Sequence, residues 1–390
     1  MIYRYRVIRD NTNLLVDLLN GRFENVPSMT KADWQRIIGE AYGHGVVPFL
    51  WYTLRTALVR PQLPPGIQEV LRANYYIEAA HFMRRQHGLK EVLRMLASAG
   101  VPVVLLKGAA IAYSAYPNPL LRTMGDVDLW IPQTQLVPAR KVLQSIGYTI
   151  FSPEDYRPQG LQDTLGGETK MMCDLRGAGL VELHWKIYPG EWLRHTTCID
   201  EAKIWARCVP IKGMNIRRMA VEDLVLHASV HLAVNHQMSD GVMRTMIDIA
   251  LARRAWDLDW TALAQRAKEW KVATAVWLVL SLVSEYFGDL EAQLPLQMLA
   301  PSRFRQRILR WFVPCIPPPG SPRLIDGPLR FLYLLLLVDR PMDAIRLLLR
   351  GFFPDRTWLV LRYKLQDAPR WRIWLQWLWH PLRLVLRRDF

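Results

Sequence analysis

The segment from Leu105 to Pro132 constrains the fold more than any other part of the chain. It begins in a short valine-rich apolar run, Val101–Leu106, which is typical of a buried strand. Lys107 and Gly108 follow at once, and a short helix is predicted directly after them. A second strand is predicted at Gly125–Ile131, where polar and apolar residues alternate. Two strands joined through a tight turn and a helix indicate a sheet that is covered by helices.

The second of these strands carries two carboxylates, Asp126 and Asp128. Side chains alternate along a strand, so both aspartates point to one face, while Val127 and Leu129 point to the other. Two carboxylates side by side repel each other unless a cation neutralises them. Oxygen ligands favour Mg²⁺, and Mn²⁺ is the alternative. The pair therefore predicts a metal site on the polar face of this strand.

A third carboxylate follows further along the chain. Two more strands are predicted at Lys170–Leu175 and Leu180–Ile187. On the second of them Glu182 and His184 share a face. If this strand lies beside the aspartate strand, Glu182 joins the cluster, and three carboxylates can hold two metal ions for displacement at phosphorus. Asp174 is the alternative third acid, and His184 is expected to pack or form hydrogen bonds rather than bind metal.

The turn after the first strand offers groups that suit phosphate. Backbone N–H groups at the start of a helix bind anions, and Gly108 lets a ligand approach the backbone closely. Ala109 supplies a further N–H group. Lys107 either adds charge toward a phosphate or lies on the surface. Arg122 either binds a phosphate or pairs with Asp126.

Together these residues resemble the nucleotidyltransferase superfamily, and more closely an uncharacterised bacterial branch of it. That branch shows K-G, R-x-x-G-D-x-D and [DE]-x-H-W, which match Lys107-Gly108, Arg122–Asp128 and Glu182–Trp185. The resemblance covers residues 30–270, and a weaker similarity is present at Phe352–Lys364. The chain departs from the pattern at Ala109, where the hydroxyl of a serine is missing. It also has a longer spacing before Asp126, and a glutamate as its third acid.

The resemblance implies an α+β fold with an α/β core: a short mixed sheet with flanking helices, set between helical N- and C-terminal regions. The expected division is a helical region at 1–99, a catalytic core at 100–190, a helical domain at 191–300 and a basic, tryptophan-rich helical region at 301–390.

The resemblance also implies a reaction. A nucleoside monophosphate, AMP from ATP being favoured, would pass to a hydroxyl or phosphate of a small-molecule, sugar or peptide acceptor, and pyrophosphate would leave. The resemblance assigns metal binding and catalysis to Asp126, Asp128 and Glu182. It assigns nucleotide binding to Lys107, Gly108, Ala109 and Arg122. The alternatives are an inactive relative that binds a nucleotide or peptide, and a scaffold acting through the basic tail.

A later helix places Asp223, His227 and His231 on one face, four residues apart. This spacing can bind Zn²⁺, but no H-E-x-x-H motif is present, so a structural role is predicted. Arg244 and Asp248, also four residues apart, are expected to form an ion pair.

Charge is concentrated near the C-terminus. The net charge is +15, and residues 301–390 hold 17 Lys and Arg against 6 Asp and Glu, together with six of the sixteen tryptophans. At 371–388 the tryptophans recur at helical spacing, and packing on the body of the protein is the simplest prediction. An acidic partner or a membrane surface is the sharper alternative. Specific DNA recognition is not expected, since no reading helix or zinc finger is evident.

Four cysteines (Cys173, Cys198, Cys208 and Cys315) form no C-x-x-C pair, which favours a reducing setting. The N-terminus shows no secretion signal, and the longest apolar runs are shorter than the ~20 residues that cross a bilayer. A cytoplasmic protein is therefore expected.

Overall fold

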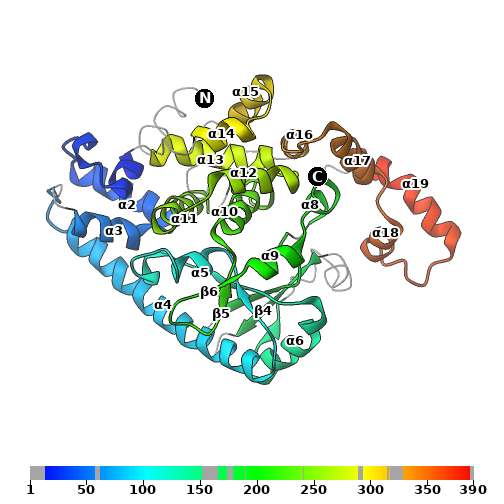
Figure 1. Cartoon of the computed structure of the whole chain (residues 1–390), viewed down its shortest axis with the longest axis horizontal. Helices are drawn as coiled ribbons and strands as arrows, with labels where there is room; N and C mark the ends of the chain where they lie inside the picture. The colour runs from blue at the N-terminus through cyan, green and yellow to red at the C-terminus, as the bar shows by residue number, and fades with distance from the viewer. Residues whose placement is uncertain are drawn as a thin grey trace.

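The computed structural model describes residues 14–57, 62–151, 166–173, 179–188, 190–239, 241–288, 293–313, 316 and 328–386. Within these ranges one mixed sheet lies between helices. Figure 1 shows α4 along one side of this sheet and the helices α10 to α13 on the opposite side. The predicted α+β class is confirmed.

The N-terminal region is helical, as predicted. Residues 14–20 are helical, and the elements that follow are η1 (Phe23–Asn25), α2 (Lys31–Gly43), α3 (Val47–Thr56) and α4 (Ile67–Ser98). Thr30 caps α2, because its hydroxyl accepts from the Asp33 N–H while the Asp33 carboxylate accepts from the Thr30 N–H. The long α4 ends just before Gly100, whose φ of +70° is the left-handed conformation that glycine adopts easily.

Seven strands form the sheet in the described part of the chain, in the order β3-β4-β5-β2-β1-β7-β6. Their bounds are β1 Val104–Leu105, β2 Asp126–Trp130, β3 Thr149–Ile150, β4 Glu168–Cys173, β5 Gly179–His184, β6 Val209–Pro210 and β7 Arg217–Arg218. The four strands predicted from the sequence are confirmed, with β1 shorter than expected. Asp174 and the turn after it lie outside the described residues.

The pairing of β2 with β5 positions the polar residues. The two strands are parallel, and Asp128 lies opposite Glu182. Val127 and Leu129 on β2 are buried, as predicted for the apolar face, and so are Val181 and Leu183 on β5. The polar face is buried as well, because helices cover it.

Short helices surround the sheet strands: α5 (Lys107–Ala112), η2 (Pro119–Leu121), η3 (Gln133–Gln135), α6 (Leu136–Ser145), α8 (Glu191–Thr196) and α9 (Glu201–Arg207). The helical region that follows contains α10 (Val221–Val230), a π-helical turn η5 (His231–Asn235), α11 (Val242–Ala255), α12 (Trp260–Glu269), α13 (Ala273–Phe287) and α14 (Gln293–Leu299). α13 is buried along most of its length and packs against α10, α11 and α12.

The predicted structural role is confirmed for Asp223 and His227 of the histidine-bearing helix. Asp223 is fully buried on α10, and its carboxylate accepts hydrogen bonds from Arg207 (2.9 and 3.1 Å) and Arg266 (3.1 Å). The Nε2 of His227 lies 3.0 Å from the carbonyl oxygen of Ile187. These contacts tie α10 to α9, α12 and the end of β5.

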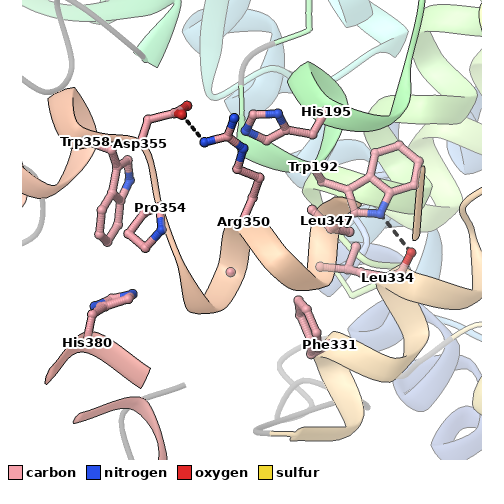
Figure 2. Close-up of a pocket in the computed structure, with 11 residues that line it drawn as sticks. Trp192, His195, Phe331, Leu334, Leu347, Arg350, Pro354, Asp355, Trp358 and His380 are labelled. Atoms are coloured by element: carbon pink, nitrogen blue, oxygen red, sulfur yellow. Dashed lines mark hydrogen bonds and ion pairs between the residues drawn. The ribbon is translucent and has the colours of Figure 1, made fainter. Parts of the chain in front are cut away.

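The C-terminal helices are α15 (Arg303–Phe312), α16 (Pro328–Leu336), α17 (Pro341–Phe352), α18 (Arg356–Arg362) and α19 (Arg370–Leu386). Contacts of α16 and α17 attach them to the rest of the chain. Tyr333 donates a hydrogen bond to the Ala233 carbonyl (2.9 Å), Trp192 of α8 donates to the Leu334 carbonyl (2.8 Å), and Lys271 pairs with Asp343 of α17 (3.1 Å). An apolar cavity of about 240 Å³ lies at this junction, and α17, Trp358 and His380 also line it. Figure 2 shows the lining residues.

The expected packing of the α19 tryptophans on the body of the protein is wrong for most of them. Trp371, Trp374 and Trp379 are more than half exposed. The buried side of α19 is formed by Ile373 and His380 instead. In the described residues no helix is both long and apolar enough to cross a membrane. The division of the chain into four regions stays a prediction.

Replacing Asp223 tests the contacts that hold α10. We expect Asp223→Ala to lower the free energy of unfolding by about 3 kcal/mol, because two arginines lose their buried partner. The matched control is Asp257→Ala, an exposed carboxylate nearby, which should change stability by less than about 0.5 kcal/mol. Urea unfolding measures both; equal effects would show that the Asp223 contacts do not stabilise the fold.

Candidate active site

Strand pairing brings the predicted acidic residues of β2 and β5 together. Asp128 and Glu182 are neighbours across the two strands, and His184 follows on the same face of β5. One ligand atom from each of these three side chains lies within 4.8 Å of the others, and all three residues are buried. The condition that the sequence set for Glu182, a strand beside the aspartate strand, is met.

Lys107 projects into this cluster. Its φ of +48° is rare for a residue with a side chain and marks a constrained turn between β1 and α5. Its Nζ lies 2.6 Å from Asp128 Oδ1 and 3.8 Å from Glu182 Oε2. Burial opposes the ammonium charge, but Asp128 and Glu182 outweigh burial and raise the pKa of Lys107. The surface alternative for Lys107 is therefore wrong.

Two further groups compensate the acids. Lys170, opposite Glu182 on β4, places its Nζ 2.6 Å from Glu182 Oε1. His184 Nε2 lies 2.8 Å from Asp128 Oδ1 and 3.5 Å from Glu182 Oε2. Burial and Lys107 work against the imidazolium, but its hydrogen bonds to Asp128 and Glu182 prevail and raise the pKa of His184 to about 9. His184 is thus a hydrogen-bonding strand residue, as expected.

The pKa values of the two acids, Asp128 and Glu182, are lowered. Burial by itself would raise the pKa of Asp128, but Lys107 and His184 hold it well below its usual range. The pKa of Glu182 is also lowered, since the hydrogen bond from His184 and the charges of Lys107 and Lys170 outweigh burial and the nearby Asp128. Both carboxylates are therefore ionised at neutral pH.

Asp126 has a different environment. It lies at the start of β2 and is partly exposed. Burial, and then the charges of Asp128 and Glu182, raise its pKa, so its negative charge is less well compensated than theirs. An additional cation would relieve this repulsion, and carboxylate oxygens are the donors that Mg²⁺ prefers. The residues present thus fit a divalent cation, although Lys107 already contacts both Asp128 and Glu182.

A cavity of about 260 Å³ opens beside Asp126 and Asp128. Lys107, Gly108 and Ala109 line it from the start of α5. Residues after the sheet form the opposite wall: Ala228, His231, His236, Gly241, Arg244, Thr245 and Asp248. Burial, and then Lys107, hold the pKa of His231 well below its usual range, so its imidazole is neutral. The helices that follow the sheet therefore complete the cavity.

Arg122 explains why position 108 is glycine. A Cβ on Gly108 would lie 2.6 Å from Arg122 Nη2 and 2.8 Å from Arg122 Cζ, so no larger residue fits while Arg122 stays in place. Asp248 of α11 fixes the guanidinium: Nε lies 2.9 Å from Oδ1 and Nη2 lies 2.9 Å from Oδ2. Tyr116 donates a further hydrogen bond to Asp248 (2.8 Å).

This arrangement corrects one expectation. The ion-pair partner of Arg122 is Asp248 rather than Asp126. The expected pair of Arg244 with Asp248 stays a prediction. The sequence also gave no role to Lys170 or Tyr116. Lys170 could have been found, because alternation along the predicted strand places it on the face that meets Glu182, whereas nothing in the sequence pairs Tyr116 with Asp248.

Substitution of Gly108 tests the contact with Arg122. We expect Gly108→Ala to displace the guanidinium and to lower the free energy of unfolding by about 1–3 kcal/mol, since the buried Asp248 loses its geometry. Gly125→Ala is the control, because a Cβ there meets nothing within 4 Å in the same cavity. Thermal unfolding of both variants measures the difference in stability. Equal melting temperatures would contradict the steric explanation.

The raised pKa of His184 predicts a pH dependence of stability in metal-free protein. The folded-state pKa of about 9 lies above the ordinary histidine pKa of 6.5, so the stabilisation is complete below pH 6.5 and is lost as the pH rises through about 9. The difference in free energy of unfolding between wild type and His184→Gln should therefore shrink over this range. Urea unfolding at several pH values measures it, and a constant difference would contradict the ionised imidazole.

Comparison with known protein families gives an independent result. A family model described as an uncharacterised nucleotidyltransferase matches residues 30–288, a range that contains the sheet, the cavity and the helices α2 to α13. No curated protein matches the chain significantly. The match confirms the resemblance seen in the sequence motifs. Because it extends over more than half of the chain, the protein belongs to this nucleotidyltransferase family.

Proposed function

We propose that the chain transfers a nucleoside monophosphate from a nucleoside triphosphate, ATP being favoured, to a hydroxyl or phosphate of a small-molecule, sugar or peptide acceptor. The bond between the α- and β-phosphates breaks, the acceptor oxygen bonds to the α-phosphorus, and pyrophosphate leaves. The observation that carries this proposal is the juxtaposition of Asp128 and Glu182 on paired strands, with Asp126 on the same strand at the mouth of the cavity. ATP is a cytoplasmic metabolite, so this function fits a cytoplasmic protein.

The carboxylates would hold the metal. Asp126, Asp128 and Glu182 offer oxygen donors for Mg²⁺, or for Mn²⁺ in its place. A divalent cation bound there would neutralise phosphate oxygens and the developing charge at the α-phosphorus. Lys107 forms an ion pair with Asp128. A cation bound to Asp128 would replace Lys107 in this pair, and the long lysine side chain would then be free to contact a phosphate.

The other side of the cavity suits the phosphates. The first N–H groups of a helix have no partner within the helix, and those of Gly108 and Ala109 belong to this set at the start of α5. The guanidinium groups of Arg122 and Arg244 line the same cavity and add positive charge. We assign Lys107, Gly108, Ala109 and Arg122 to nucleotide binding on this ground.

A binding module without transfer activity is the second candidate. It is favoured by one observation: Lys107, Lys170 and His184 already compensate Asp128 and Glu182, so these two acids need no metal to be stable. Such a module would bind a nucleotide or peptide and release no pyrophosphate.

Replacing Asp126 separates function from stability. We expect Asp126→Asn to keep or raise the melting temperature, because it removes a carboxylate that its neighbours repel. The same variant should lose at least about tenfold of the Mg²⁺-dependent affinity for a non-hydrolysable ATP analogue. Asp128→Asn should also lose that affinity but destabilise the fold, since Lys107 and His184 lose their partner.

Calorimetric titration measures the binding, and transfer of label from α-labelled ATP to candidate acceptors measures the reaction. Asp257→Asn, on the surface, is the matched control. Folded wild type that binds none of the four nucleoside triphosphates with Mg²⁺ would refute the proposed function. Binding without any release of pyrophosphate would favour the binding module.

A further inference from the structure

Helix α17 turns an apolar stripe toward solvent. Met342, Ile345, Leu349 and Phe352 are exposed and lie three or four residues apart, so they share one face of the helix. The opposite side of α17 is the one that packs: Leu347 is buried and lines the cavity shown in Figure 2. A helix that buries one face normally leaves a polar face to water, whereas the exposed side of α17 carries this apolar stripe next to Arg346 and Arg350.

Helix α19 repeats this arrangement with larger side chains. Its exposed apolar residues follow helical spacing along one face: Trp371, Trp374, Leu375, Leu378, Trp379 and Leu382. Trp371 and Trp374 are each 64% exposed. Exposed tryptophans on this scale exceed the scattered single apolar residues of an ordinary surface.

Ring contacts connect the two helices. Phe353, directly after α17, lies 4.9 Å from the Trp377 ring, and Trp377 lies 5.6 Å from the Trp374 ring, measured between centroids. Figure 1 shows α17, α18 and α19 extending away from the body of the molecule. We call the exposed apolar residues of α17 and α19, with Phe353 and Trp377, the C-terminal apolar surface.

Positive charge accompanies this surface. A cavity of about 470 Å³ between α18 and α19 is lined by Arg356, Arg370, Trp374 and Trp377, together with Leu359 and Ile373. Within the described residues neither Arg356 nor Arg370 has a carboxylate within ion-pair distance, whereas Arg346 and Arg350 are paired with Asp343 and Asp355. The cavity thus combines two uncompensated guanidinium groups with tryptophan walls, a combination suited to a phosphate group beside an apolar phase.

We propose that the C-terminal apolar surface binds an anionic phospholipid bilayer from one side. The tryptophans and leucines would enter the boundary between headgroups and acyl chains, where tryptophan is favoured, and Arg356 and Arg370 would contact lipid phosphates. No described helix can span a bilayer, so this contact is peripheral. A second copy of the chain is a poorer occupant, because a two-fold contact would bring the same excess of arginines face to face.

This inference is independent of the transfer reaction. The helices α17 to α19 lie outside residues 30–288, the range of the nucleotidyltransferase match. The C-terminal apolar surface therefore takes no part in the active-site cavity. It would hold the nucleotidyltransferase at a membrane.

Vesicle flotation of the full-length chain tests the proposal. The probes are vesicles of phosphatidylcholine alone and vesicles of phosphatidylcholine mixed with phosphatidylglycerol. We expect wild type to float with the mixed vesicles, to shift its tryptophan fluorescence to shorter wavelength, and to release partly at high salt. Trp371→Gln/Trp374→Gln/Trp379→Gln should reduce the partition on the order of tenfold. Arg356→Gln/Arg370→Gln should remove the preference for the anionic vesicles.

The matched control is Tyr76→Gln/Met83→Gln on α4, whose side chains are 63% and 62% exposed and lie far from this surface in the sequence. It should float like wild type. All substituted side chains are exposed, so unfolding temperatures should stay unchanged and confirm that each variant is folded. Wild type that floats with neither vesicle, or a tryptophan variant that floats as well as the control, would overturn the proposal. So would a lipid-free dimer, seen by light scattering, that the tryptophan substitutions dissociate.

Discussion

The parallel pairing of β2 with β5 is the interaction on which the site depends. It sets Asp128 directly opposite Glu182 and places both in a buried layer, where two carboxylates cannot remain without compensation. Lys107, Lys170 and His184 supply that compensation from three different elements. A shift of one residue in this register would turn the acids into the apolar layer and the leucines and valines out of it. The register and the charge cluster therefore support each other.

A second buried ion pair joins the sheet to the helices that complete the cavity. Arg122 precedes β2, Asp248 lies on α11, and Tyr116, which follows α5, donates a hydrogen bond to the same carboxylate. Because Gly108 has no Cβ, the Arg122 guanidinium can lie directly against it. Because the same arginine lines the cavity and fixes α11, the shape of the cavity depends on contacts far apart in the sequence. Arg122 and Asp248 both lie within the range 30–288 of the family match.

The C-terminal helices obey different rules. In the nucleotidyltransferase part the buried acids Asp128, Asp223 and Asp248 are paired with basic side chains. In contrast, α17 and α19 expose apolar stripes, and Arg356 and Arg370 have no carboxylate partner among the described residues. Exposed tryptophans at helical spacing beside these two arginines favour contact with an apolar phase that carries anionic groups. The contrast separates the nucleotidyltransferase part from a part that contacts something outside the molecule.

The sequence by itself determined four of the strands, the glycine that ends α4, and the set of acids, because alternation and turn residues act over a few neighbours. It also determined the family, through motifs that are local. It did not reveal the two-residue strands β3, β6 and β7. Only the tertiary structure decided the partners of those residues. Lys107 neutralises Asp128, Arg122 pairs with Asp248 across 126 positions, and the α19 tryptophans face solvent instead of the body. The physical reason is that a charge or an apolar face is stabilised by the groups next to it in space. The periodicity of the sequence does not identify those groups.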